Sequence, residues 1–136
     1  MAANYVTLST PPIQTSNVTA ASNATTTSGS DVLMTGMTIT PIAGTYFVIF
    51  TGVIQQNISG NSVTISFYVG GTQDATSIMD AAPFAGGTLT AGQASVPYVT
   101  HGVYTVNGSQ AIAVEWHVSG GTGTVFQRKM TVVKIG

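Results

Sequence analysis

An all-β fold, a single jelly-roll sandwich, is predicted for this sequence by three observations. β-branched and aromatic residues recur in short runs bounded by Gly, Asn, Ser or Pro, and no long segment repeats apolar residues at helical spacing. The runs follow one another at intervals of roughly 8 to 12 residues, which is typical of a sandwich or jelly roll. A length of 136 residues suits one domain with one hydrophobic core.

The chain divides into an N-terminal segment, residues 1–30, and a jelly-roll domain, residues 31–136. The segment has few large apolar side chains, and its adjacent prolines favour an extended backbone. We therefore expect either an extended arm or an edge strand, and an arm of this kind can order against a partner surface. The candidate residues for partner attachment are Pro11, Pro12, Ile13 and Val18.

The first strands of the domain are expected at Val32 to Thr40 and at Gly44 to Gln55. In the second of these, alternate residues point to opposite faces, and both faces are apolar around Phe47 and Ile49. A strand of this kind is covered on both sides, once by the other sheet and once, we expect, by a neighbouring subunit of a homotrimer. The candidate residues of that subunit interface are Tyr46, Val48 and Phe50.

The remaining strands are bounded by turn residues such as Gly70-Gly71 and Asn107-Gly108. Alternation places Val63, Ile65 and Phe67 toward the core. Residues 74–92 have a weaker pattern, which leaves open whether this loop binds a ligand. The expected strands are Val63 to Val69, Ala94 to Val106, Gln110 to Val118 and Thr124 to Ile135.

Charge is scarce, with three basic and four acidic residues and a net charge of −1. Three basic residues are too few to contact successive phosphates of a nucleic-acid backbone. No nucleic-acid partner is therefore expected. A neutral surface repels itself weakly, which favours contact with identical or foreign subunits; a neutral, hydroxyl-rich exterior is the alternative.

The last strand contains all three basic residues, Arg128, Lys129 and Lys134, with Lys129 on the opposite face from the other two. We interpret them as protection of an edge strand, paired locally with Glu115 or the C-terminal carboxylate.

Membrane and disulfide chemistry are not expected. No apolar run approaches the roughly 20 residues of a membrane-spanning helix, and the first eight residues do not form a secretory signal. The chain has no cysteine, which excludes disulfides and thiolate ligands for a metal.

Glu115 and His117 share one face of a strand, where they could act as a general acid and base. The interpretation we favour is a polar outer face opposite a buried Trp116, with no catalytic residue, cofactor or metal ion. The histidines, His101 and His117, and the acidic residues are scattered along the chain. In a trimer, copies of one histidine or aspartate could still meet around an ion on the three-fold axis.

The stretches Gly36 to Phe50 and Val63 to Gly71 resemble the tumour necrosis factor and complement globular-head superfamily. Gly44 and Tyr46 carry most of this resemblance, and residues 103–116 and 123–135 resemble the later strands of the family. The resemblance implies a jelly roll that associates as a compact trimer around an aromatic-lined axis. The cysteines and calcium-binding acids of the family have no counterparts in this chain.

Versions of this domain with little charge and much Thr and Gly resemble proteins of tailed bacteriophages. This resemblance implies a virion structural protein that decorates the outer surface of the capsid, with itself and the major capsid protein as partners. The alternatives are a receptor- or glycan-binding tip of a phage fibre and a bacterial jelly-roll lectin. For a host glycan, the candidate stacking platforms are Tyr68, Tyr98, Tyr104 and Trp116.

Overall fold

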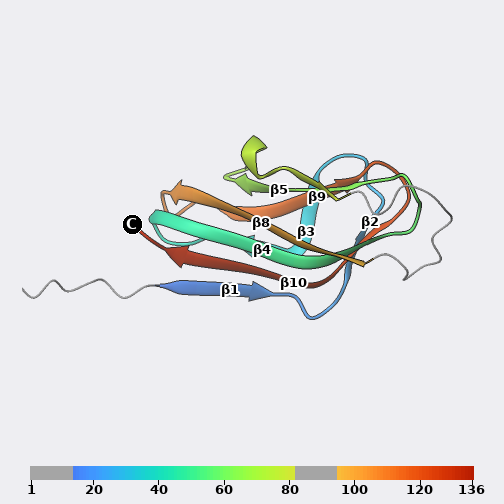
Figure 1. The fold of residues 1–136 in the computed structure, drawn as a ribbon. Helices are drawn as coiled ribbons and strands as arrows, with labels where there is room; N and C mark the ends of the chain where they lie inside the picture. The colour runs from blue at the N-terminus through green and yellow to red at the C-terminus, as the bar shows by residue number, and fades with distance from the viewer. Residues whose placement is uncertain (1–13, 82–94) are drawn as a thin grey trace, which may run out of the picture.

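The structure is a computed structural model that describes residues 14–81 and 95–136. These residues form two antiparallel sheets packed face to face as a sandwich (Figure 1). The elements are β1 (Thr15–Thr19), β2 (Ala24–Thr26), β3 (Val32–Ile39), β4 (Gly44–Gln56), β5 (Val63–Val69), β6 (Thr72–Gln73), the 3-10 turn η1 (Ala75–Ser77), β7 (Met79–Ala81), β8 (Ser95–Val106), β9 (Ile112–Val118) and β10 (Gly123–Lys134).

Sheet A has the strand order β1-β10-β4-β8, with β2 also paired to β10. Sheet B has the order β3-β9-β5-β6, with β7 also paired to β5. From β3 to β5, and again from β8 to β10, consecutive strands alternate between the two sheets. The connections therefore cross from layer to layer, which gives a jelly-roll-like sandwich.

The expected strands of the domain are confirmed within one or two residues at each end. The strand expected at Val63 to Val69 is β5 itself. Turn residues set these limits: Gly70 and Gly71 have positive φ angles of 58° and 82°, which glycine adopts without steric cost.

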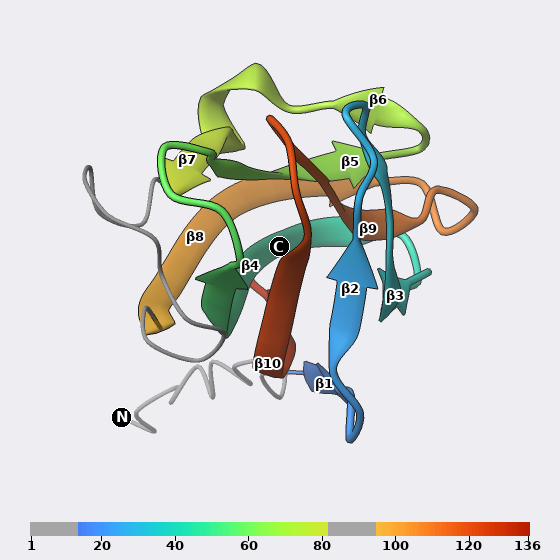
Figure 2. The same ribbon diagram turned by 90° about the vertical axis from the view of Figure 1, so that its right-hand side faces the viewer.

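The described part of the N-terminal segment belongs to the sandwich. β1 pairs with β10 from Thr15 to Thr19, and β2 pairs with the beginning of β10 (Figure 2). Ala24 and Thr26 of β2 are buried. Residues 14–26 therefore show the second of the two expected forms, with β1 as the edge strand of sheet A.

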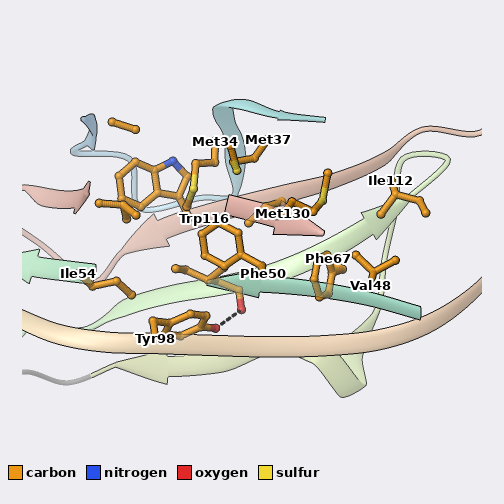
Figure 3. Close-up of a cluster of buried hydrophobic side chains, with 14 of the residues drawn as sticks. Met34, Met37, Val48, Phe50, Ile54, Phe67, Tyr98, Ile112, Trp116 and Met130 are labelled. Carbon is orange, nitrogen blue, oxygen red and sulfur yellow. Dashed lines mark hydrogen bonds between the residues drawn. The ribbon is translucent and has the colours of Figure 1, made fainter. Parts of the chain in front are cut away.

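The core lies between the two sheets and follows the two-residue alternation of the strands (Figure 3). Trp116 from sheet B and Phe50 from sheet A are fully buried in it. The Phe50 ring meets the Tyr98 ring edge to face at a centroid distance of 6.0 Å, and the Tyr98 hydroxyl donates to the carbonyl of Ile65 at 3.3 Å. The buried phenol therefore connects sheet A to the backbone of sheet B.

The turn before β4 explains the two residues that carry the family resemblance. The Tyr46 hydroxyl donates to the carbonyl of Ile42 at 2.9 Å, across the turn. A Cβ at Gly44 would lie 2.9 Å from the carbonyl oxygen of Gly136 and 2.6 Å from Cε of Lys134. Only glycine allows this close approach of the C-terminal end of the chain.

The 3-10 turn η1 is the helical element of the described residues, and it is far too short to cross a membrane.

Candidate assembly face

The structure corrects the residues expected at a subunit interface. Tyr46, Val48 and Phe50 point between the two sheets and are at most 4% exposed. They are buried by sheet B of the same chain, so a second subunit cannot reach them. The alternation predicted for β4 is confirmed. The face of β4 that sheet B does not cover is the one with Phe47 and Ile49.

The outward-facing side of sheet A, here called the outer face of sheet A, is apolar across neighbouring strands. Phe47 of β4 lies between Val103 of β8 and Val133 of β10, and Ile49 lies beside His101. The side chains on β4 are half-buried, whereas Val99 and Val103 on β8 are 56% and 58% exposed. Two large aliphatic side chains are thus mostly in solvent on one strand.

Charge is nearly absent from this face. Lys129 of β10 lies in register with Thr51 of β4, and it is the lysine that alternation places on the outer side. His101 packs edge to face against Phe47, with ring centroids 5.9 Å apart. The most exposed aliphatic side chains of this face therefore have few charged neighbours.

β8 forms one border of this face, since β4 is its strand partner in the described part of the chain. On its inner side, the ring of Tyr104 covers Gly102: a Cβ at Gly102 would lie 2.1 Å from the Tyr104 hydroxyl oxygen. That hydroxyl donates to Oδ2 of Asp74 at 2.7 Å, and burial, followed by this hydrogen bond, raises the pKa of Tyr104. The inner side of β8 is fixed by these contacts, which leaves its outer side chains for a partner.

Among the candidate attachment residues, Val18 lies in β1 and packs against the core, half-buried. It is occupied within its own chain. Pro11, Pro12 and Ile13 lie outside the described residues.

Sheet B presents a different outer face. His117 Nδ1 lies 2.7 Å from Oδ1 of Asp31, while Tyr68 and Gln73 donate to Oδ2 of Asp31 at 2.6 and 3.0 Å. Gln73 also donates to the Ser66 hydroxyl. Asp31, which precedes β3, therefore joins β9, β5 and β6 through one carboxylate.

The pKa values of Tyr68 and Glu115 on this face are raised. The hydrogen bond to Asp31, helped by burial, raises the pKa of Tyr68 to about 12. Burial, followed by the charge of Asp31, raises the pKa of Glu115 above its usual value. Glu115 and His117 share the expected polar face, and His117 is oriented by Asp31, a partner that sequence reasoning missed because 86 positions separate them.

The basic residues of the last strand lie on the faces predicted for them, but their expected role is wrong. β10 is not an edge strand, because β1, β2 and β4 all pair with it. Arg128 is 1% exposed and donates to the carbonyls of Thr35 and Ser22. The pair His117–Asp31 is the ion pair found among the described residues, so Arg128 is not paired with Glu115.

Two of the expected stacking platforms, Trp116 and Tyr98, are buried, so a glycan cannot reach them. Tyr68 and Tyr104 are half-buried, and their hydroxyls donate to Asp31 and Asp74. Residues 74–81 of the loop contain η1 and β7, while residues 82–94 lie outside the described part. No cluster of three or more histidine and acidic side chains suited to a metal ion occurs in residues 14–81 and 95–136.

No protein-family model matches the chain, and no curated protein matches it in sequence. Solved structures similar to it come from the VP2 protein of infectious bursal disease virus. One is a mutant VP2 from derived T=1 particles, with a TM-score of 0.60 and 17% identity over 100% of this chain and 36% of that one. Another is the VP2 subviral particle, with a TM-score of 0.57 and 16% identity over 100% of this chain and 38% of that one.

A structure of the Gt strain of the same virus matches with a TM-score of 0.59 and 17% identity, over 92% of this chain and 34% of that one. The chain spans little more than a third of the length of these neighbours. At such identity the likeness concerns the fold: an all-β sandwich of two antiparallel sheets, similar to part of a viral capsid protein.

Proposed function

We propose that this chain is a virion structural protein, a homotrimeric jelly roll that decorates the outer surface of a tailed-phage capsid. The observation that carries the proposal is the outer face of sheet A, where apolar side chains lie side by side with little charge among them. Burying an exposed valine contributes about 1.5 kcal/mol or more, so covering Val99 and Val103 would stabilise a complex.

A second copy of the same chain is the occupant we propose for this face. Neutral, apolar surfaces can be self-complementary, and a charged partner would find almost no counter-charge here. The trimer is also what the resemblance to the tumour necrosis factor superfamily implies. In that arrangement Phe47 and Ile49, with His101 beside them, would lie toward the neighbouring subunits.

Attachment to the major capsid protein is proposed for residues 1–13, which include Pro11, Pro12 and Ile13. Their composition favours an extended backbone able to order on a partner. β1 and β2 are part of the sandwich, so the attachment segment must end before Gln14.

We propose no catalytic role for Glu115 and His117. Asp31 holds His117 inside a network of side chains that already use one another as partners. The double change Glu115→Gln and His117→Asn should leave capsid binding intact.

The test is reconstitution with phage capsids that lack the protein. We expect the purified chain to be a trimer by light scattering and to bind capsids in many copies without added sugar. A chain starting at Gln14 should remain a trimer with a similar melting temperature and fail to bind. A monomer at micromolar concentration, or unimpaired capsid binding by the truncated chain, would contradict the proposal.

A second candidate function, a receptor- or glycan-binding tip or a lectin, is favoured by a different observation. An open cavity lined by uncharged polar side chains lies beside an aromatic ring, where β10 leaves its regular pairing.

A further inference from the structure

β10 is interrupted by a bulge. Phe126 lies opposite Val53 of β4, yet Lys129 lies opposite Thr51, so β10 holds one extra residue between these pairs. Gln127 occupies the bulge with a φ of 47°, and it is the non-glycine residue with positive φ in the described chain. Such a conformation is unfavourable for a residue with a side chain, and it persists only where the surroundings impose it.

Arg128 imposes it here. Arg128 follows Gln127 in the chain; its side chain is buried, and its guanidinium donates to the carbonyls of Thr35 and Ser22. With Arg128 fixed inward and Phe126 fixed outward in register with Val53, the backbone of Gln127 has little freedom. The bulge thus holds Gln127 in an exposed position at a defined place on the surface.

A cavity of about 540 Å³ opens at this bulge. It lies between the connection from β1 to β2, the ends of β4 and β8, and the bulge itself. Its size falls within the range of roughly 300 to 1,000 Å³ that is usual for small-molecule sites. The side chains that give it its chemistry are Asn23, Gln55, Ser95, Phe126 and Gln127.

The lining combines amides, a hydroxyl and a half-exposed aromatic ring, and none of the described residues that line it is charged. Gln55 donates to the Ser95 hydroxyl at 2.7 Å, which aligns this pair along one wall. The side chains of Asn23 and Gln127 make no hydrogen bond to any other residue in the described chain. Each amide can donate and accept at once, so these two groups are available to a ligand.

We propose that this cavity binds a neutral saccharide. A sugar presents hydroxyls that donate and accept along its rim, which amides and a serine hydroxyl can match, and an apolar C–H face, which the Phe126 ring can cover. Phosphorylated and carboxylated ligands would find no cation in the lining. The proposal rests on the second candidate function, glycan binding, and it does not depend on the trimer or on capsid attachment.

The site lies at one end of the outer face of sheet A, next to the row of Val99 and away from Phe47 and Val103. The paired residues Val99, Thr51 and Lys129 lie between the cavity and the row that contains His101 and Ile49. Variants at the bulge can therefore be assayed for sugar binding without touching Val103 or Phe47.

The test uses the full chain, an array of neutral and sialylated glycans, and NMR titration with methyl glycosides of glucose, galactose and mannose, with lactose and with maltose. We expect neutral sugars to bind, with shifts at Phe126 and Gln127. Gln127→Gly should weaken binding by about tenfold or more, because it removes the amide. Its melting temperature should stay equal or rise, because glycine accepts the positive φ.

Phe126→Leu keeps an apolar side chain and removes the ring face, so it should also weaken binding about tenfold. Gln14→Ala, an exposed glutamine outside the cavity, is the matched control and should bind normally. The proposal is overturned if no neutral sugar binds at millimolar concentration, if only sialylated glycans bind, or if Gln127→Gly and Phe126→Leu bind like the unchanged chain.

Discussion

The two outer faces of the sandwich differ although the same alternation of side chains produces both. On sheet A, Phe47, Ile49 and Val103 lie together with almost no charge. On sheet B, the corresponding positions hold a hydrogen-bonded network centred on Asp31. Three of the four acidic residues, Asp31, Asp80 and Glu115, belong to the sheet B side.

The two faces therefore differ in how their side chains are stabilised in water. On sheet B the polar groups around Asp31 satisfy one another, and Leu33 of β3, 52% exposed, is the large aliphatic side chain on that face, opposite Glu115. The sheet A face leaves aliphatic surface in water, which costs free energy until something covers it. The contrast predicts that substitutions on sheet A alter assembly, whereas substitutions on sheet B alter stability and its dependence on pH.

The largest expected effect concerns assembly. Val99→Lys combined with Val103→Lys should weaken self-association by roughly 100-fold or more, because two ammonium groups would have to be desolvated. Both positions are exposed on an edge strand, so the monomer should fold normally. Sedimentation velocity measures the change. Leu33→Lys on β3 of sheet B, 52% exposed and opposite Glu115, is the control; equal effects from both variants would remove the distinction between the faces.

A smaller effect is expected from the centre of the sheet B network. Asp31→Ala removes the acceptor of His117, Tyr68 and Gln73, and should lower the free energy of unfolding by about 2 to 3 kcal/mol in urea denaturation. Asn17→Ala on sheet A loses one exposed hydrogen bond from Thr131 and should cost less than about 0.5 kcal/mol. Similar costs for the two variants would show that the network contributes little.

The smallest effect is a change in pH dependence. Because the pKa of Glu115 is raised in the folded state, the folded chain binds this proton more tightly than the unfolded chain. Stability should therefore fall as pH rises from the usual value of 4.5 toward the raised pKa. Glu115→Gln should abolish that fall and stabilise the chain at pH 7, on the order of 0.5 kcal/mol after screening. Thermal unfolding across pH 4 to 8 measures it, and a destabilised variant would argue against it.

Much of the fold could be predicted because period-two patterning and turn residues are local signals. β5 and β9 were predicted with the right residues inward. The interface was assigned to the wrong side of β4, since alternation tells which residues share a face and not which face the chain itself covers. Phe47 and Ile49 are apolar residues on one face of β4. Val99 and Val103 also share one face of β8, and this shared face is the local signal that indicates the outer side of sheet A.

Other features had no local signal. Asp31 meets His117 across 86 positions, and Arg128 meets Ser22 across 106. Gln127 gives no hint of its positive φ, because the bulge depends on pairing with β4. Contacts of this kind are set by the arrangement of the sheets, which residue patterns within one strand do not contain.

The pairing of β1 and β2 with β10 has a consequence for how the protein is made. The first described strand is completed by the last one, with Thr15 opposite Val133. During synthesis, β1 and β2 can pair only after β10 (Gly123–Lys134) has emerged from the ribosome, because every shorter nascent chain lacks the strand that holds them. Until then, the edge of β4 that pairs with β10 has no strand partner. Sheet A is therefore completed only when β10 takes its place between β1 and β4.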